Sequence, residues 1–118
     1  MLYKICDINS IQNNDMKVFK LKIKSNVIDV LIGKINGKLF ACNNYCPHRG
    51  ASLSKSDLSP SNNRIICYLH DFEYSLTTGK LEKIPIKWST QDSEWKKSDN
   101  LALYNIIEKD NKIYLDIP

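Results

Sequence analysis

The alternation of apolar and polar residues over Met16–Lys24 is the feature that most limits how this chain can fold. Phe19, Leu21 and Ile23 fall on one face of an extended segment, and lysines fall on the other. This period of two is typical of a half-buried β-strand. No stretch of the sequence shows a convincing helical period of apolar residues, so we expect an all-β, antiparallel domain.

The clearest turn follows a second run rich in β-branched residues, Val27–Ile35. Asn36 and Gly37 are residue types that adopt the two positive φ angles of a type I′ hairpin turn. Residues 38–43 then supply the returning strand. Further strands are expected at residues 3–8, 101–108 and 112–117. The last two of these would form a second hairpin, with a turn longer than two residues.

The length of 118 residues fits one domain that buries about two-thirds of the surface its unfolded chain would expose. Residues 46–85 are too long for a structureless connection unless the segment has a function. Residues 87–100 are polar apart from Trp88 and Trp95, and they predict an excursion between strands. We therefore expect a single domain over residues 1–118, with a functional segment inside it.

The formal net charge of +4 comes from 17 basic and 13 acidic residues. Only two of the basic residues are arginines, Arg49 and Arg64, and the lysines are spread along strand-like segments. A nucleic-acid-binding protein more often clusters its charge and uses arginine, so we expect no nucleic-acid partner. Apolar runs are far shorter than the ~20 residues of a membrane span, and the N-terminus lacks the apolar stretch of a secretory signal. We expect a cytoplasmic chain with no membrane partner.

Both histidines of the chain lie in one pattern with two of its four cysteines. Cys46 and His48 form a C-x-H pair, and Cys67 and His70 form a C-x-x-H pair. Two thiolates and two imidazoles are ligands that suit either zinc or an iron–sulfur cluster. Zinc modules usually pair like residues, two cysteines and then two histidines. A binuclear cluster with one iron on two cysteines and the other on two histidines needs one residue of each type from each loop.

The segments CPHRGASLS and CYLHDFEYSLTTG resemble the cluster-binding region of Rieske proteins, which carry a 2Fe-2S centre. The resemblance covers residues 46–79 in detail. It implies that Cys46 and Cys67 bind one iron, and that His48 and His70 bind the other through Nδ1. It also implies a small antiparallel β-sandwich or barrel with an inserted cluster-binding subdomain, about residues 44–85, in a base β-domain built from the remainder.

The sequence departs from the family pattern near the second histidine. Asp71 stands where many members have glycine, and aspartate tolerates a positive φ better than most residues. Phe72 stands where high-potential members have a serine that donates to a cluster sulfur, so we expect a low reduction potential. The hydroxyl of Tyr74 would offset part of this if it reached a ligand sulfur. The spacer between the pairs is also longer, with a polar insertion at residues 54–63.

The resemblance implies a soluble one-electron carrier, a Rieske-type ferredoxin that is not itself an enzyme. Its partners would be a reductase, expected to be a flavoprotein, and a terminal oxygenase or another electron acceptor. We expect a monomer. A terminal oxygenase is excluded, because 118 residues leave no room for its mononuclear-iron catalytic domain. Two alternatives remain open: a small Rieske subunit of a larger redox enzyme, such as a nitrite-reductase-like one, and a zinc-stapled binding module.

The two remaining cysteines, Cys6 and Cys42, lie in strand-like segments and are interpreted as ordinary thiols. Membrane bc-type Rieske subunits carry a further cysteine pair at the positions of Ala51 and Leu69, and this chain lacks it. We therefore expect no disulfide, in agreement with a reducing compartment.

Overall fold

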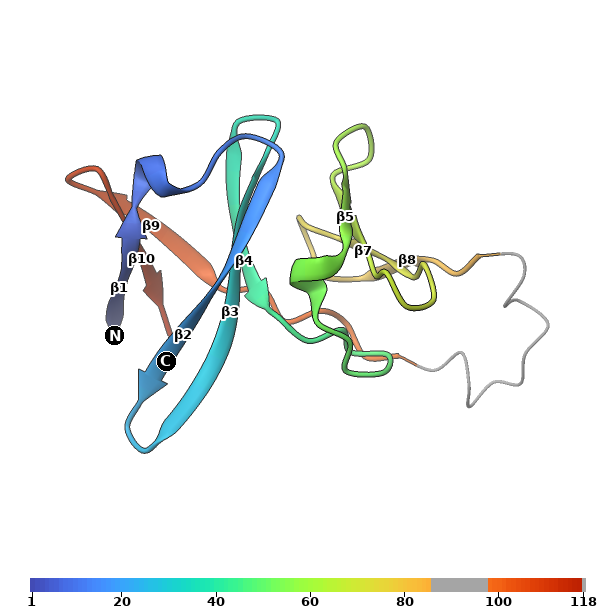
Figure 1. Ribbon diagram of the computed structural model, residues 1–118, viewed down its shortest axis with the longest axis horizontal. Helices are drawn as coiled ribbons and strands as arrows, with labels where there is room; N and C mark the ends of the chain where they lie inside the picture. Colours follow the sequence, from blue (N-terminus) through green and yellow to red (C-terminus); the bar gives the residue numbers. More distant parts are fainter. Residues whose placement is uncertain (86–97, 118) are drawn as a thin grey trace.

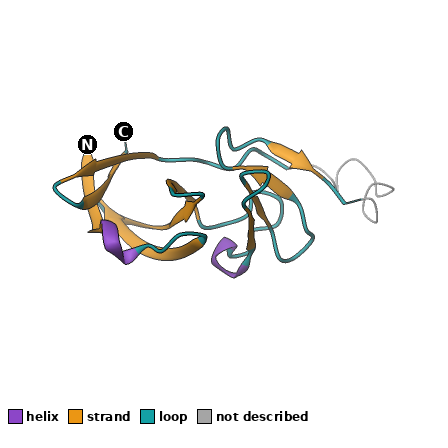
Figure 2. Cartoon of the chain, turned by 90° about the horizontal axis from the view of Figure 1, so that it is seen from above, coloured by secondary structure: helices purple, strands orange, loops and turns teal. Residues whose placement is uncertain are grey.

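The computed structural model describes residues 1–85 and 98–117, and antiparallel β-strands dominate it (Figures 1 and 2). The predicted all-β class is confirmed. Two short 3-10 helices are η1 (Ile8–Ser10) and η2 (Leu53–Lys55), and no described helix is long and apolar enough to cross a membrane. The strands are β1 (Leu2–Asp7), β2 (Asp15–Ile23), β3 (Asn26–Ile35), β4 (Lys38–Asn43), β5 (Asp57–Ser59), β6 (Arg64–Ile66), β7 (Glu73–Ser75), β8 (Leu81–Lys83), β9 (Asn105–Lys109) and β10 (Lys112–Asp116).

The strands form three antiparallel sheets that follow one another along the molecule (Figure 1). The sheet β1-β10-β9 joins the two ends of the chain, and the sheet β2-β3-β4 lies in the middle. The third sheet, β5-β6-β7-β8, lies on the far side of the middle sheet from the chain ends. All of its strands fall within residues 44–85, the range expected for a cluster-binding subdomain.

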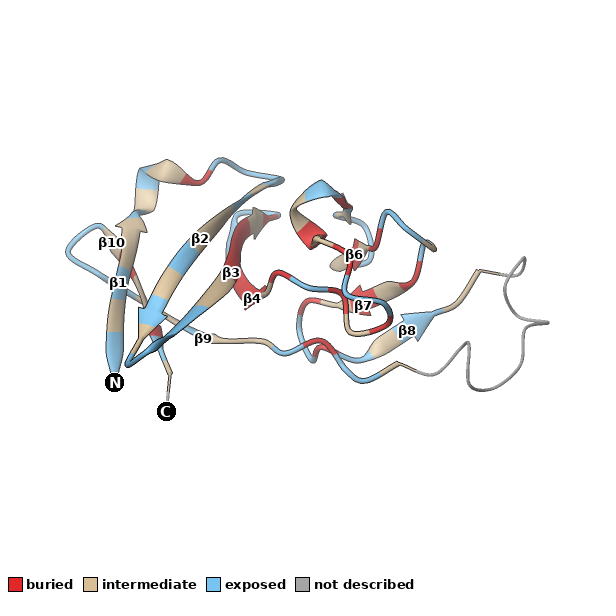
Figure 3. Cartoon of the chain, turned by 60° about the horizontal axis from the view of Figure 1, so that its bottom comes forward, coloured by how far each residue is buried: buried red, intermediate tan, exposed pale blue. Residues whose placement is uncertain are grey.

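The second half of strand β3 is buried on both of its faces, which explains the apolar run Val30–Ile32, whereas the start of the strand is exposed (Figure 3). Val30 and Ile32 belong to a core shared with Ile113 and Leu115 of β10. Leu31, on the opposite face, belongs to a second core. The middle sheet is therefore held by apolar packing on either side.

The second core joins the middle sheet to the segment that carries the predicted ligands. Its buried members come from β3 and β4, from the loops that carry the predicted ligands, from η2, from β6 and β7 with the turn after β7, and from the segment entering β9. They are Leu31, Ile35, Phe40, Cys42, Cys46, Ala51, Leu53, Ile65, Cys67, Phe72, Tyr74, Leu76 and Leu101. The predicted ligand cysteines are thus part of the same apolar core as the base sheet.

The first predicted hairpin is confirmed. The strands expected at residues 16–24, 27–35 and 38–43 appear as β2, β3 and β4, each within a residue or two of its expected ends. Asn36 has φ +51° and Gly37 has φ +77°, and Ile35 pairs with Lys38 across the turn. Both turn residues therefore lie in the left-handed region, as a type I′ turn requires.

The second hairpin differs from its prediction in two respects. Its turn has two residues rather than a longer loop, because Asp110 and Asn111 both take a positive φ, of +53° and +63°. Its first strand begins at Asn105 rather than at residue 101. The preceding residues run along the free edge of β4, where Leu103 forms an isolated bridge with Cys42. That crossing between sheets is a tertiary feature that strand propensity does not report.

The opening strand ends at Asp7, and Ile8 begins η1. The polar insertion at residues 54–63 contains β5 and the turn into β6, and Asn36 Nδ2 donates to the carbonyl oxygen of Pro60 at 2.7 Å. Trp88 and Trp95 lie outside the described residues, as does most of the excursion predicted at residues 87–100.

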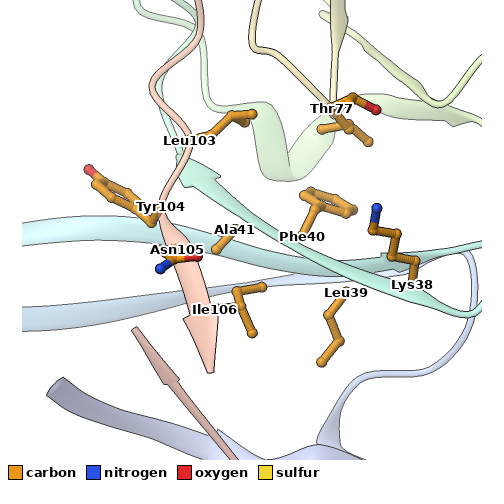
Figure 4. A pocket seen from close by; sticks show the side chains of 10 residues that line it. Lys38, Leu39, Phe40, Ala41, Thr77, Leu103, Tyr104, Asn105 and Ile106 are labelled. Atoms are coloured by element: carbon orange, nitrogen blue, oxygen red, sulfur yellow. The ribbon is translucent and has the colours of Figure 1, made fainter. Parts of the chain in front are cut away.

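A groove of about 460 Å³ lies where parts of the three sheets meet (Figure 4). Its walls come from β4, from the turn after β7 and from the segment entering β9, and none of the four predicted ligands lines it. The lining residues are Lys38, Leu39, Phe40, Ala41, Leu76, Thr77, Leu103, Tyr104, Asn105 and Ile106.

Gly79 fixes the contact between the turn after β7 and the segment entering β9. It has φ +81°, and a Cβ at this position would overlap the carbonyl oxygen of Leu101. The Leu101 N–H donates to the Gly79 carbonyl at 2.7 Å. Gly37 has a similar φ, +77°, but nothing lies within 4 Å of the place its Cβ would take.

We expect Gly79→Ala to lower the free energy of unfolding by roughly 3 kcal/mol, since backbone strain and overpacking add. Gly37→Ala introduces backbone strain without overpacking and should lower the free energy of unfolding by about 1 kcal/mol. Urea unfolding of the two variants measures the difference. Equal losses would show that the contact with Leu101 contributes nothing.

Candidate metal centre

The first predicted pair lies in a six-residue loop between β4 and η2, here called the first ligand loop, residues 46–51. The Cys46 N–H donates to the carbonyl of Ala51 at 2.8 Å, and the Gly50 N–H donates to the carbonyl of Cys46 at 2.7 Å. Gly50, the fifth residue, has φ +74°. These two hydrogen bonds close the loop on its cysteine.

The second ligand loop, residues 67–72 between β6 and β7, is closed in the same way. The Cys67 N–H donates to the carbonyl of Phe72 at 2.9 Å, and the Asp71 N–H donates to the carbonyl of Cys67 at 2.8 Å. Asp71, again the fifth residue, has φ +59°. The expectation that aspartate replaces glycine here by adopting a positive φ is confirmed.

Backbone N–H groups of each loop point at the sulfur of its own cysteine. Cys46 Sγ accepts from the N–H groups of His48 and Arg49, and Cys67 Sγ accepts from those of Leu69 and His70. The donors are two and three residues after the cysteine in both loops. Such donors stabilise a sulfur that carries negative charge, as a metal-bound thiolate does.

The two sulfurs are also coupled to one another. The Cys67 thiol donates to Cys46 Sγ, and this bond, helped by Tyr74 and the backbone donors, lowers the pKa of Cys46 to about 6 against the opposing effect of burial. The same shared proton, together with burial, raises the pKa of Cys67. One thiolate therefore forms readily in the metal-free pair, and its charge resists formation of the second.

The two imidazoles form a second pair. The rings of His48 and His70 meet edge to face, with centroids 5.4 Å apart and an interplanar angle of 70°. His48 also stacks on the buried ring of Phe72, with centroids 4.0 Å apart and planes 12° from parallel. His70 is half-buried, and its Nδ1 atom is fully shielded from solvent. Stacking and burial thus fix both ring orientations.

The structure pairs the two predicted cysteines with one another and the two predicted histidines with one another. Within residues 1–85 and 98–117, no three His, Cys, Asp or Glu side chains converge as a site for one metal ion. A pair of sulfurs that each accept from backbone N–H groups and a pair of imidazoles are a donor set that suits two irons with different ligands. The side chains present therefore fit a Rieske-type centre.

Asn44 braces the first ligand loop and was not anticipated from the sequence. It is 3% exposed, and its side-chain oxygen accepts from the Ser54 N–H at 3.0 Å while its Nδ2 donates to Ser52 Oγ at 2.9 Å. Its backbone carbonyl accepts from Leu53 and its N–H donates to Asp29. A lone Asn two residues before a cysteine gives no signal that its side chain will be buried.

The hydroxyl of Tyr74 reaches the sulfur of a predicted ligand, a possibility that the sequence left open. Its hydroxyl lies 3.4 Å from Cys46 Sγ, and its side chain is fully buried. The hydroxyl also contacts Ser98 Oγ at 2.9 Å. Ser98 lies at the end of the polar excursion and belongs to no motif, so its position beside Tyr74 could not be predicted.

Two loops of this kind on antiparallel sheets define a protein with a Rieske-type iron–sulfur site. A sequence model of the Rieske [2Fe-2S] domain matches residues 1–94, and the chain belongs to this family. The cofactor of the family is a 2Fe-2S cluster, so the zinc-stapled module considered from the sequence is set aside.

Curated relatives include both long and short proteins. The chain is 25% identical over 113 residues to a cholesterol 7-desaturase of Caenorhabditis elegans, and 33% identical over 81 residues to mouse apoptosis-inducing factor 3. These matches cover 96% and 69% of this chain but only 25% and 12% of those proteins. The chain therefore spans a quarter or less of their length. It is 29% identical over 89 residues to a 3-phenylpropionate/cinnamic acid dioxygenase ferredoxin subunit of Photorhabdus laumondii, covering 75% of this chain and 73% of that one.

Solved structures share the fold along the whole chain. The ferredoxin of Sphingomonas yanoikuyae B1 has a TM-score of 0.77 at 16% identity, covering 100% of both chains. The ferredoxin of carbazole 1,9a-dioxygenase from Nocardioides aromaticivorans IC177 has a TM-score of 0.75 at 14% identity, covering 98% of this chain and 96% of that one. The expected Rieske ferredoxin fold is confirmed.

We propose that Cys46, His48, Cys67 and His70 are the four ligands of the cluster, the two cysteines on one iron and the two histidines on the other. Cys67→Ser should then abolish the visible absorption of the purified protein, because it removes one of two thiolates from that iron. Cys6→Ser is the matched control, since Cys6 lies in β1 outside both ligand loops, and it should keep the full spectrum. Colour that survives in the Cys67 variant contradicts the assignment.

Proposed function

We propose that this protein is a one-electron carrier that accepts electrons from a reductase, a flavoprotein, and delivers them to a terminal oxygenase or another redox enzyme. The observation that carries the proposal is the alignment with a dioxygenase ferredoxin subunit over about three-quarters of both chains. The full-length fold match to ferredoxins supports it. On this proposal the protein takes part in an oxidoreductase system without catalysing the reaction itself.

The geometry of the two ligand loops supports a carrier. When bound, the 2Fe-2S group takes up and releases single electrons. Cys46 and Cys67 are 2% and 3% exposed, so the protein shields the sulfurs from water. His70 is half-buried, and its neighbours Tyr68 and Leu69 are each 46% exposed. His48 is 7% exposed, so His70 is the member of the site that comes closest to the surface, and it is the expected route for the electron.

The cellular setting proposed for this carrier is the cytoplasm, where it would act as a monomer. Cys6 and Cys42 are free thiols, as are both proposed ligand cysteines. Burial raises the pKa of Cys42 to about 12, so its thiol stays protonated and unreactive. Unpaired cysteines of this kind are usual in reducing compartments.

A second function deserves a test because of one alignment. The match to the cholesterol 7-desaturase covers 96% of this chain but a quarter of that protein. The same fold can therefore be one part of a larger redox enzyme, and a Rieske subunit of such an enzyme is the alternative. In that case the electron would pass within a stable complex rather than between molecules that collide.

Reductive titration with kinetics separates these functions. We expect the wild-type protein to take up one electron per chain. NADH with a flavoprotein ferredoxin reductase of a dioxygenase system should reduce it, and ferricytochrome c should reoxidise it in a second-order reaction. The Cys67→Ser variant should take up none. A chain that exchanges electrons only inside an isolated stable complex would favour the subunit function, and a chain that takes up no electron would contradict both.

The midpoint potential is expected in the lower part of the family range, nearer roughly −150 mV than +300 mV. Phe72, which stacks on His48, supplies no hydroxyl to a cluster sulfur, and Tyr74 offsets this only in part. Voltammetry at neutral pH measures the value. A midpoint above about +150 mV on the same scale would contradict the expectation. Phe72→Ser is a poor probe, because the residue is fully buried and its loss would leave a cavity.

A further inference from the structure

Ser98 is linked through Tyr74 to a proposed ligand sulfur. The Tyr74 hydroxyl lies 2.9 Å from Ser98 Oγ and 3.4 Å from Cys46 Sγ. Ser98 Oγ in turn donates to the backbone carbonyl of Asp99 at 2.9 Å. A continuous row of hydrogen-bond contacts therefore runs from Cys46 Sγ, through two hydroxyls, to a backbone carbonyl.

The number of protons decides how this row can be arranged. Each hydroxyl has one proton, and a carbonyl can only accept. While Ser98 donates to Asp99, the contact between Tyr74 and Ser98 needs the Tyr74 proton. The contact between Cys46 and Tyr74 is then a hydrogen bond only if the sulfur donates as a thiol. When Cys46 is a protonated thiol, all donations can run in one direction, away from the sulfur.

A sulfur that binds iron is a thiolate and has no proton to donate. Tyr74 then has two acceptors for its single proton, Cys46 Sγ and Ser98 Oγ. Its side chain is fully buried, so water does not enter the competition. The contact of 2.9 Å with Ser98 is a normal O–H···O distance. For Tyr74 to donate fully to the sulfur while keeping this contact, Ser98 must turn its own proton away from Asp99.

We propose that Ser98 is a positioning residue that competes with Cys46 for the Tyr74 proton and so holds the midpoint potential down. Hydrogen bonds to a cluster sulfur raise the potential, because they stabilise the electron-rich reduced form. The share of the Tyr74 proton that Ser98 accepts is lost to the sulfur. This inference rests on the proposed function, through the assignment of Cys46 as a ligand.

Midpoint potentials of four proteins test the proposal: wild type, Ser98→Ala, Tyr74→Phe and the double variant. Ser98→Ala should raise the equilibrium constant for reduction about threefold, which is about 28 mV at 59 mV per tenfold for one electron. Tyr74→Phe should lower it, because the hydroxyl is gone. The double variant should match Tyr74→Phe, since Ser98 acts only through Tyr74. Visible and EPR spectra confirm that each protein carries the cluster.

Two further variants at Ser98 separate loss of the hydroxyl from loss of the fold. Ser98→Thr keeps the hydroxyl and should keep the wild-type potential, whereas Ser98→Gly should reproduce the rise if the alanine variant does not fold. An unchanged or lower potential on loss of the hydroxyl overturns the proposal, as does an equal rise in the Tyr74→Phe background. Failure of the cluster assignment, on which both the proposed function and this inference rest, is distinguishable, because the wild-type protein itself would then show no one-electron wave.

Discussion

Strand β3 is packed against apolar side chains on both of its faces, and the placement of the metal centre depends on this. On one face Val30 and Ile32 contact the sheet that joins the chain ends. On the other, Leu31 shares a core with Cys46 and Cys67. Because buried apolar side chains are close-packed, a shift of the middle sheet would move the cysteines as well. The ligand loops are thus held by a layer that lies wholly outside them.

The two ligand loops have different cysteine–histidine spacings but the same backbone. In each, the cysteine N–H and carbonyl are bonded to the sixth and fifth residues, and the fifth residue has a positive φ. Gly50 fills that position in one loop and Asp71 in the other. Each sulfur consequently accepts from two N–H groups of its own loop. The two cysteines thus occupy equivalent positions in the two loops, whereas His48 lies two residues after its cysteine and His70 lies three residues after its own. The thiols form one pair and the imidazoles form another.

Features that depend only on residues close together in the chain could be predicted from the sequence. The alternation in β2, the turn at Asn36 and Gly37 and the four proposed ligands all depend on residue types at short spacing. The late start of β9 could not be predicted, because it follows from the crossing of residues 101–104 along the edge of β4. The burial of Asn44 and the contact of Ser98 with Tyr74 are likewise tertiary. Asn44 contacts Ser54, ten residues away, and Ser98 contacts Tyr74, 24 residues away.

The first and last strands are neighbours, and the N-terminal ammonium lies 3.1 Å from the carboxylate of Asp116. Figure 1 shows both ends of the chain at the side of the molecule opposite the ligand loops. A longer polypeptide could therefore enter and leave this domain at one place without covering the ligand loops at the other end. Such an arrangement suits a unit that can be spliced into longer chains, and it would also tolerate circular permutation with new ends elsewhere on the surface.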